Sequence, residues 1–318
     1  MVRTENGITK AQLMDEALLE KFFLSLNVRP RSVADYRYSL KSFFRYLNER
    51  GIEEPAREHV FAYRDSLLES GKKPSTVHAY VVAVKLFFRW LCQEGLYHDI
   101  ANLVKTPGQR NEHRRYALTS RQALALLNHI DRSTLKGLRN YAMLTVMVVG
   151  GLRCVEVSRA KVGDFTRRGN DTVLYVYGKG RDDSDTEYIR LPVNARKAIR
   201  EYLKERGNVG QNAPLFACTG NRNINGPLST RTISKIAKDA MLTAGYDSDR
   251  LCAHSLRHTA VTLALKGGEN LEAVKEFARH TNVNTTLIYS HSIDREHSTC
   301  SRTIEKVIFG GKRSGIKK

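Results

Sequence analysis

The second half of the chain contains arginine, histidine, lysine and tyrosine side chains that could bind a phosphate group. Arg153 follows the pair Gly150-Gly151 and is expected to begin a short helix. Helix N-termini attract anions, and a guanidinium placed there adds a bidentate grip on phosphate. Glu156 comes one helical turn later and can brace the arginine. An ordinary surface Arg–Glu pair explains this motif equally well.

A second motif, His254-Ser-Leu-Arg257-His258, combines an imidazole with another guanidinium. His254 and Arg257 are three residues apart, and side chains at this spacing are neighbours on a helix. Both could therefore reach one phosphate. The alternative is a helix edge with ordinary polar residues, and the spacing alone does not decide between the two.

Three further residues complete an ordered set. Lys179 lies in Gly178-Lys-Gly-Arg-Asp-Asp183, which reads as a turn between two strands. His280 follows Arg257 after 23 residues, and Tyr289 follows His280 after nine. A single histidine or tyrosine at such a position is usually a packed or hydrogen-bonded structural residue. The order Arg, Lys, His-x-x-Arg, His, Tyr is far more specific than any one of its members.

The cysteines and histidines do not form a metal-binding pattern. The five cysteines are scattered, odd in number and without a C-x-x-C pair, which is typical of reduced thiols. His254 and His258 stand one helical turn apart, but a metal site needs more ligands than that pair. We therefore expect neither a metal nor a cofactor. The cysteines are Cys92, Cys154, Cys218, Cys252 and Cys300.

The elements that must position these residues divide into two domains joined by a linker. Residues 1–104 are expected to form an all-helical domain, because apolar residues recur at helical spacing and glycines follow the helices. Residues 105–116 are polar and basic around the turn Pro107-Gly108, as is typical of a linker. The expected helices of the first domain cover about 13–26, 31–51, 58–70 and 75–95.

Residues 117–309 are expected to form a second domain of mixed structure, and residues 310–318 a basic, mobile tail. Thr119-x-x-Gln122 before an apolar run predicts a capped helix start. Residues 172–177 and 187–191 predict the two strands of a hairpin. The fold class is therefore mainly helical with a small sheet (α+β). The expected helices cover about 120–130, 138–148, a short segment from 153, 230–244, 255–266 and 271–279.

The net charge of the 318-residue chain is +19, and it is unevenly distributed. Residues 1–116 contain 19 Lys and Arg against 14 Asp and Glu, so most of the excess lies beyond residue 116. Such a charge favours a nucleic-acid partner over a merely soluble basic surface. No apolar run reaches the roughly 18 residues that a membrane span needs, and no signal-peptide layout opens the chain. We therefore expect a cytoplasmic protein with no membrane partner.

Together, the motifs resemble the tyrosine recombinase (phage integrase) family in its Xer-like two-domain form. Residues 12–104 are similar to the helical, SAM-like core-binding domain of the family, and residues 117–309 to its catalytic domain. The resemblance implies a site-specific enzyme that cuts and rejoins DNA through a 3′-phosphotyrosyl intermediate without a metal. It assigns the catalytic positions to Arg153, Lys179, His254, Arg257, His280 and Tyr289, with Glu156 in support.

The resemblance also implies a role for each catalytic side chain. Tyr289 attacks the scissile phosphate, but only about one phenol in a thousand is ionised at pH 7, so a base or cations must assist it. Arg153 and Arg257 neutralise charge in the transition state, and His280 donates a hydrogen bond to it. His254 is expected to accept the tyrosine proton, because an imidazole titrates near neutrality.

Lys179 is expected to protonate the departing 5′-oxygen. Gly178 and Gly180 flank it, and a glycine-rich turn can carry the ammonium to the minor groove. Arg181 lies in the same turn and is an alternative cation.

Double-stranded DNA is the expected partner. Helices of both domains enter the major groove in the family, and the candidates here are 75–93 and 230–244. The second of these carries Arg231, Lys235 and Lys238 beside apolar residues. A solvated helix face is the alternative explanation of that pattern.

The family works as a tetramer on synapsed DNA sites. The resemblance therefore implies a homo-tetramer on DNA and a monomer or dimer without it. Residues 301–309 offer Ile304, Val307 and Ile308 for docking on a neighbour, and packing within the same protomer is the alternative.

Two other functions fit the same motifs. A type IB topoisomerase shares the chemistry but needs no second DNA site, and the compact first domain and the possible docking segment favour a recombinase. A DNA-binding protein with an inactive site is the non-enzymatic alternative, and the full catalytic set argues against it. Chromosome-dimer resolution, plasmid resolution and mobile-element integration are equally compatible with the sequence.

Overall fold

The computed structural model describes residues 9–107, 116–178, 187–220, 223–280 and 282–287. The chain divides into two compact units, Met1–Glu112 and His113–Lys318. The expected tail 310–318 and docking segment 301–309 lie outside the described residues.

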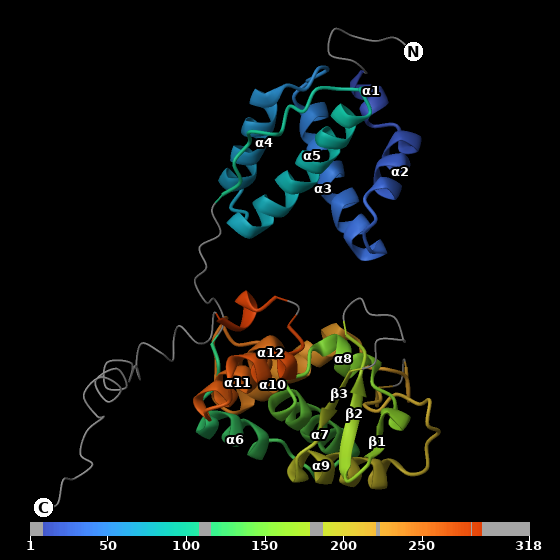
Figure 1. Ribbon diagram of the computed structural model, residues 1–318, viewed down its shortest axis with the longest axis vertical. Coiled ribbons are helices and arrows are strands. Elements are labelled where there is room, and N and C mark those ends of the chain that lie inside the picture. The colour runs from blue at the N-terminus through green and yellow to red at the C-terminus, as the bar shows by residue number, and fades with distance from the viewer. Residues whose placement is uncertain (1–8, 108–115, 179–186, 221–222, 281, 288–318) are drawn as a thin grey trace, which may run out of the picture. The chain divides into compact units, whose positions relative to one another are not determined.

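The first unit is helical throughout its described part, as the sequence predicts (Figure 1). The expected helix 13–26 is present as α2 but begins only at Glu16, because Asp15 adopts an extended backbone (φ −61°, ψ 128°) at its N-cap, and a short helix, α1, precedes it. Prolines at the first helical position open two of the longer helices, where a missing N–H costs nothing. The helices are α1 (Lys10–Leu13), α2 (Glu16–Ser25), α3 (Pro30–Glu49), α4 (Arg57–Glu69) and α5 (Pro74–Gln93).

Aromatic rings fill the core of the first unit. Phe87 is fully buried and meets Phe22, Phe44 and Phe88 with ring centroids 5.2, 5.8 and 5.6 Å apart, mostly edge to face. These side chains recur at helical spacing along α2, α3 and α5, so each helix turns one apolar stripe inward. Rings in this arrangement gain energy beyond the burial of their area.

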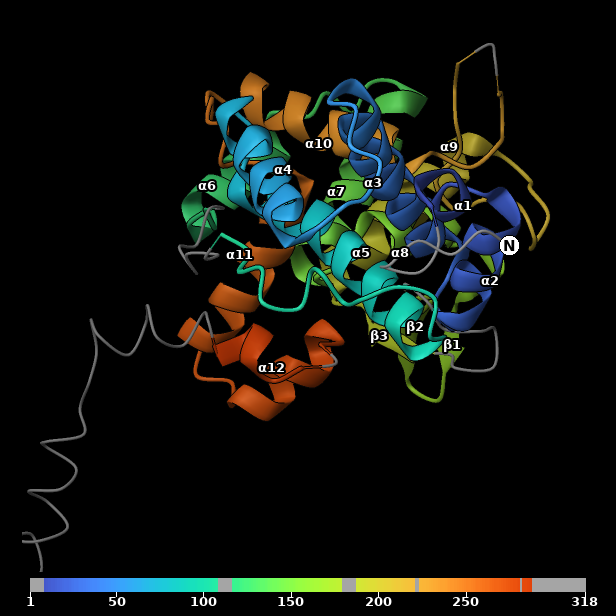
Figure 2. The ribbon, with the colours of Figure 1, turned by 90° about the horizontal axis from the view of Figure 1, so that it is seen from above.

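The second unit combines a small sheet with helices. Figures 1 and 2 show α11 and α12 on one side of the unit and the sheet on the other. The helices are α6 (Ser120–Asn128), α7 (Leu135–Val149), α8 (Cys154–Arg159), α9 (Val193–Arg206), α10 (Thr230–Thr243), α11 (Ala253–Lys266) and α12 (Leu271–Ala278). The strands are β1 (Phe165–Arg168), β2 (Asp171–Val176) and β3 (Glu187–Arg190).

The sheet confirms the expected hairpin and adds a strand to it. β2 and β3 pair antiparallel, with Val176 opposite Glu187, and the turn between them lies outside the described residues. The additional strand is β1, which pairs antiparallel with β2 through a turn at Gly169 and was not expected from the sequence. The segment Phe165–Arg168 is mostly exposed and charged at its end, so it lacks the apolar alternation of a strand.

The helix α9 was not expected from the sequence. Its buried residues Ala195, Ala198, Ile199 and Tyr202 have clear helical spacing after Pro192. It packs against α7, whose other side meets α11. The capped start predicted at Thr119 is confirmed, since its side chain accepts from the backbone N–H of Gln122. Contacts with α9 and α11 hold α7 in the core, and the chain continues from the C-terminus of α7 through Gly150 to α8.

No helix within the described ranges is both long and apolar enough to cross a membrane.

Replacing Phe87 with alanine tests the aromatic core. We expect the free energy of unfolding to fall by about 3–5 kcal/mol, because the ring leaves a cavity among three aromatic neighbours. Urea unfolding followed by circular dichroism measures the change. Leu24→Ala is the control, because Leu24 is 81% exposed and its loss should change stability by less than about 0.5 kcal/mol. Equal effects of both substitutions would contradict this packing.

Candidate active site

Arg153 is the N-cap of α8, with an extended backbone (φ −81°, ψ 152°) that turns its side chain away from the helix axis. Its backbone N–H donates to Glu156 Oε2 at 2.8 Å, and its Nη1 donates to Glu156 Oε1 at 2.8 Å. Nη2 donates to the carbonyl of Arg279 at 2.9 Å. These side-chain bonds use two of the five guanidinium N–H donors, and 28% of the side chain stays exposed. The arginine is therefore fixed yet accessible.

Glu156 is fully buried between two arginines. Besides Arg153, it accepts from Arg279 Nη2 at 2.9 Å and from Arg279 Nε at 3.3 Å. Burial by itself raises the pKa of the Glu156 carboxyl, but the charges and hydrogen bonds of Arg279 and Arg153 outweigh it and lower the pKa below its ordinary value. The carboxylate is therefore ionised at neutral pH and ties α8 to the end of α12.

Arg257 lies one helical turn into α11 and is 1% exposed. Its Nη1 donates to the carbonyl of Gly151 at 2.5 Å, and Arg279 Nη2 donates to the same carbonyl at 3.1 Å. Gly151 has φ of 59°, a conformation that favours glycine, and a Cβ there would meet the ring of Phe277 at 3.2 Å. The Gly-Gly break seen in the sequence thus brings one backbone oxygen to two guanidiniums.

His254 and His280 complete the described part of the cluster. His254 is exposed in the first turn of α11, with its ring packed edge to face on His258 at 4.7 Å between centroids. His280 directly follows Arg279 after α12. Its Nδ1 lies 2.9 Å from Oγ1 of Thr286, which is fully buried. The ring of His280 is therefore held in one orientation.

Burial and neighbouring positive charges both act on His280. Burial, followed by the charges of Arg257, Arg153, His254 and Arg279, lowers the pKa of His280 to about 4. The hydrogen bonds of Arg279 to Glu156 and to the carbonyl of Gly151, which also accepts from Arg257, join α8, α11 and the end of α12 at this site. His280 is consequently neutral at pH 7 and can donate from one nitrogen while the other accepts.

Two expected site residues, Lys179 and Tyr289, lie outside the described residues. Two residues that sequence reasoning did not select, Arg279 and Thr286, contact the site directly. Arg279 stands next to His280 in the sequence, but nothing in its type or spacing predicts a buried side chain. Thr286 lies three residues before Tyr289, and this short spacing is the one signal that could have drawn attention to it.

The basic residues expected to bind DNA lie on α10. Arg231 and Lys235 are exposed, and Lys235 forms an ion pair with Asp239 at 2.9 Å. Lys238 is half-buried and donates to the carbonyl of Ser248 at 2.8 Å, so it is partly committed within the unit. The opposite face of α10 is buried through Ile233, Ala237 and Met241. α10 therefore offers a polar, cationic outer face.

No group of three or more histidine, cysteine or acidic side chains within the described ranges could hold a metal ion. The described charged groups of the site are arginines, histidines and Glu156, whose carboxylate oxygens already accept from Arg153 and Arg279. Such a set of groups suits an anion rather than a cation.

The comparison with known proteins agrees with a site of this kind. Residues 117–296 match the Phage integrase family, and residues 16–95 match the N-terminal SAM-like domain of phage integrases. The first match alone covers more than half of the chain. The chain belongs to the phage integrase family, whose members include the tyrosine recombinases described next.

Relatives of known name are tyrosine recombinases. The chain is 33% identical to tyrosine recombinase XerC of Pelobacter propionicus over 196 residues, which is 61% of each protein and less than two thirds of that relative. It is 28% identical to tyrosine recombinase XerD of Xanthomonas axonopodis pv. citri over 291 residues, 89% of this chain and 93% of that protein.

Solved structures share the fold at lower identity. The XerH site-specific recombinase bound to difH in a post-cleavage complex has a TM-score of 0.71 at 21% identity, covering 92% of this chain and 85% of that one. The Tn1549 transposon integrase in complex with transposon right end DNA has a TM-score of 0.69 at 16% identity, covering 96% and 100%. These likenesses establish the fold class, mainly helical with a small antiparallel sheet.

The low pKa of His280 predicts how stability changes with pH. The folded pKa of about 4 lies below the ordinary value of 6.5, so the unfolded chain takes up the proton first. We therefore expect the free energy of unfolding to be constant above about pH 7 and to fall as the pH drops from about 6.5 towards 4.

Urea unfolding across this range, with ring-nitrogen NMR of His280, measures both quantities. His280→Gln should flatten the slope between pH 6.5 and 4, because it removes the titrating group. A His280 ring that becomes protonated near pH 6.5 would contradict the burial and charges described above.

Proposed function

We propose that this chain is a site-specific DNA recombinase that cuts and rejoins strands through a 3′-phosphotyrosyl link to Tyr289, without a metal. The observation that carries the proposal is the hydrogen-bond network of the second unit, in which Arg279, the residue before His280, accepts from Arg153 at its carbonyl and shares the carbonyl of Gly151 with Arg257. His254 lies one helical turn before Arg257 on α11. Membership of the phage integrase family and the names of the relatives support the same function.

The cations would stabilise the pentacoordinate phosphorus. Negative charge grows on the non-bridging oxygens as Tyr289 attacks, and fixed donors that already point at these oxygens lower the barrier. Arg153 is exposed enough to bind the phosphate directly. Arg257, at 1% exposure, acts from a region of low dielectric, where its field is only weakly screened.

The two histidines have different proposed roles: His280 donates a hydrogen bond, and His254 accepts a proton. With the hydroxyl of Thr286 as donor, Nδ1 of His280 accepts and the remaining proton stays on Nε2. A neutral His280 then donates from Nε2 to a phosphate oxygen. His254 is exposed at the helix start, and we propose that it takes the proton of the attacking phenol.

Lys179 is proposed as the acid that protonates the departing 5′-oxygen. Gly178, the last described residue before it, accepts at its carbonyl from Arg159 Nη1 at 3.1 Å. Arg159 ends α8, the helix that Arg153 begins. The base of the turn is therefore anchored to the same short helix as the site.

Double-stranded DNA is the proposed substrate. The outer face of α10 presents Arg231 and Lys235, and α5 of the first unit exposes Ser75, Thr76 and Arg89. Phosphate contacts from such residues release counterions, so binding should weaken steeply with salt. XerH bound to difH and the lambda integrase bound to DNA support this choice. The expected division into a core-binding domain at 1–104, a linker at 105–116 and a catalytic domain at 117–309 remains part of the proposal.

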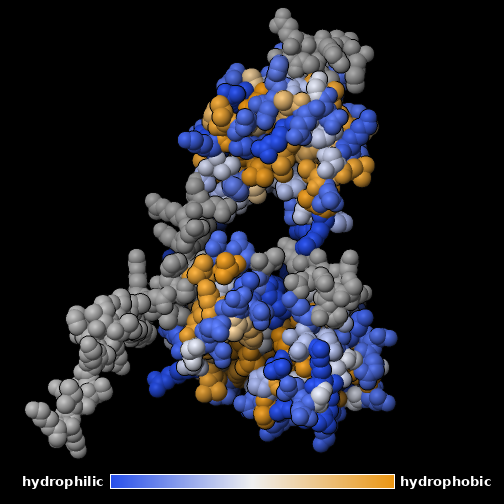
Figure 3. Space-filling model, in the orientation of Figure 1, coloured by the Kyte–Doolittle hydropathy of each residue, from blue (hydrophilic) through white to orange (hydrophobic). Residues whose placement is uncertain are grey.

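A tetramer on synapsed sites is the proposed active assembly, as in the lambda integrase tetramer bound to a Holliday junction. A groove of about 550 Å³ in the second unit is lined mainly by apolar residues of α11 and α12, among them Leu263, Val274 and Phe277. Figure 3 shows apolar surface on this side of the unit. We propose that residues 301–309 of a neighbouring protomer dock there.

Replacing Tyr289 with phenylalanine tests the nucleophile. We expect DNA binding within about threefold of the wild type but no covalent adduct, because the phenol oxygen that forms the phosphotyrosine is gone. The assay traps adducts on a nicked duplex and resolves them on a denaturing gel. Tyr188→Phe, on the edge strand β3, should form adducts normally. An adduct with Tyr289→Phe, or loss of wild-type activity in EDTA, would overturn the proposal.

Disrupting the groove tests the assembly. We expect Leu263→Asp and a chain ending at residue 300 to bind DNA and form adducts but to lose strand exchange between two sites. The charge would oppose docking of an apolar segment in the first case, and the segment itself is absent in the second. Leu124→Asp, on an exposed leucine of α6, is the control. Full exchange by both variants would rule out this docking.

A further inference from the structure

We propose that Arg279 is a positioning residue that neutralises Glu156, so that the positive charge of Arg153 remains available to the phosphate. The inference rests on the proposed function, because it concerns the same site. It assigns a task to a side chain that does not itself reach the DNA.

The burial of Arg279 separates its task from those of the other arginines. Its side chain is 4% exposed, whereas that of Arg153 is 28% exposed. Its side-chain hydrogen bonds point inward: Nη1 donates to the carbonyl of Phe277 at 2.7 Å, and Nη2 donates to the carbonyl of Gly151 and to Glu156. A guanidinium committed to two carbonyls and a buried carboxylate is not placed to bind substrate. It can act only through the groups that it holds.

The charges of the cluster show what Arg279 contributes. Glu156 must be present to hold Arg153, since it caps the backbone N–H and binds Nη1. A glutamate paired with Arg153 alone would form a neutral pair, and its negative charge would repel the phosphate that Arg153 attracts. With Arg279 on the other side of the carboxylate, the three groups carry a net charge of +1. The glutamate then orients Arg153 without cancelling its field.

The backbone of Arg279 contributes a second contact. Residue 279 adopts the left-handed conformation (φ 53°, ψ 47°) at the end of α12, which glycine would adopt with less strain. In this conformation its carbonyl accepts from Arg153 Nη2 at 2.9 Å, and the next residue is His280. An arginine therefore occupies a position better suited to glycine, and strain of this kind at a site indicates that the side chain has a use there.

The carbonyl of Gly151 links Arg279 to Arg257, the second arginine of the proposed site. Gly151 accepts from both Arg279 and Arg257, so the two guanidiniums share one fixed oxygen. Arg279 thereby contacts groups that hold Arg153 and Arg257 at once. A single side chain connects α8, α11 and α12.

A double-mutant cycle with Glu156 tests the proposal. Arg279→Gly keeps the backbone conformation and removes the guanidinium, which leaves Glu156 free to cancel Arg153. We expect the single-turnover rate of adduct formation to fall by about 10- to 100-fold at saturating DNA, as for other residues that orient a catalytic group. Adding Glu156→Gln to the Arg279→Gly variant should raise its rate of adduct formation at least about threefold, because the surplus negative charge is gone.

The rescue distinguishes charge from mere support. If Arg279 only held the fold together, removing a second buried partner would slow the enzyme further. A wild-type rate for Arg279→Gly, or no rescue by Glu156→Gln, would therefore overturn the proposal. Thermal unfolding and DNA affinity of each variant exclude loss of structure. If Arg279→Gly does not fold, Arg279→Lys takes its place: a retained charge should keep more than a tenth of the rate, and a lower rate overturns the proposal.

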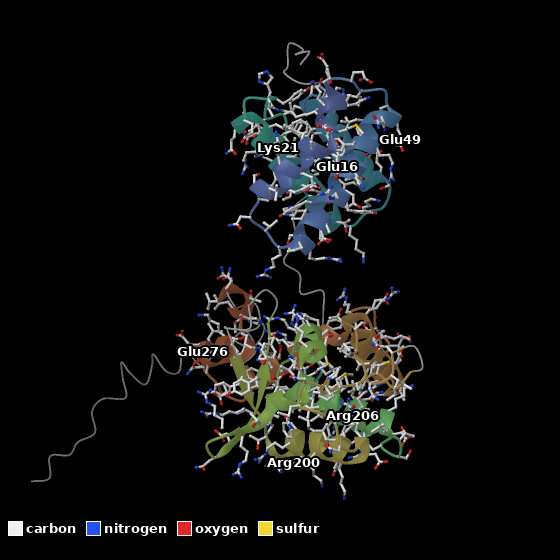
Figure 4. The ribbon with its side chains drawn as sticks, turned by 90° about the vertical axis from the view of Figure 1, so that its right-hand side faces the viewer. Glu16, Lys21, Glu49, Arg200, Arg206 and Glu276 are labelled. Carbon is white, nitrogen blue, oxygen red and sulfur yellow. The ribbon has the colours of Figure 1, made fainter. Side chains whose placement is uncertain are left out.

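Two comparisons keep this test separate from the proposed function. Wild-type protein without any adduct would end the proposed function, whereas an active wild type with an equally active Arg279→Gly ends only this inference. The matched control is Arg206→Met, because Arg206 also donates to backbone carbonyls, those of Pro214 and Leu215. Figure 4 labels Arg206 on α9, well apart from Glu276 on α12. This substitution should leave the single-turnover rate within about threefold of the wild type.

Discussion

The ion-pair network of the buried carboxylate of Glu156 is the interaction on which the site depends. A buried charge is costly unless it is paired and hydrogen-bonded, and among the described residues Arg153 and Arg279 meet this condition for Glu156. These two partners belong to different elements, one at the start of α8 and the other at the end of α12. The carboxylate therefore forces the two elements together, and the carbonyl of Gly151 adds α11 through Arg257. Gly151 lies 106 residues before Arg257 and Glu156 lies 123 residues before Arg279, and one acid and one carbonyl bring this segment to the two later helices.

The cations gathered in this way repel one another, so the rest of the unit must resist their separation. α7 supplies that resistance, because it is buried along most of its length and packs against α9 on one side and α11 on the other. Dense packing of this kind transmits strain and does not yield gradually. Burial lowers the pKa of His280, and the neighbouring positive charges lower it as well, so this rigid frame holds cations beside a neutral imidazole. Preorganised charge of this kind is what stabilises a transition state that gains negative charge.

Sequence patterns predict those parts of this arrangement that depend on local physics. Apolar spacing predicts most helices, and the β-branched run predicts β2 with its partner β3. The order of Arg153, His254, Arg257 and His280 predicts a common site. The differences also have physical causes: the backbone conformation of Asp15 delays the start of α2, and β1 pairs with the edge that β2 offers. Neither cause is visible in residue types, since conformation and pairing are settled by tertiary contacts.

Arg279 shows most clearly where a sequence stops being informative. Its type favours the surface, and its left-handed backbone favours glycine, so both local preferences argue against its position. Only the folded unit reveals that a buried carboxylate and two carbonyls surround it. Where a residue violates two local rules at once, the compensation has to come from its partners, and those partners are the groups that also hold Arg153 and Arg257. Arg279 therefore marks a position at which the contacts of the site outweigh the local preferences of the residue.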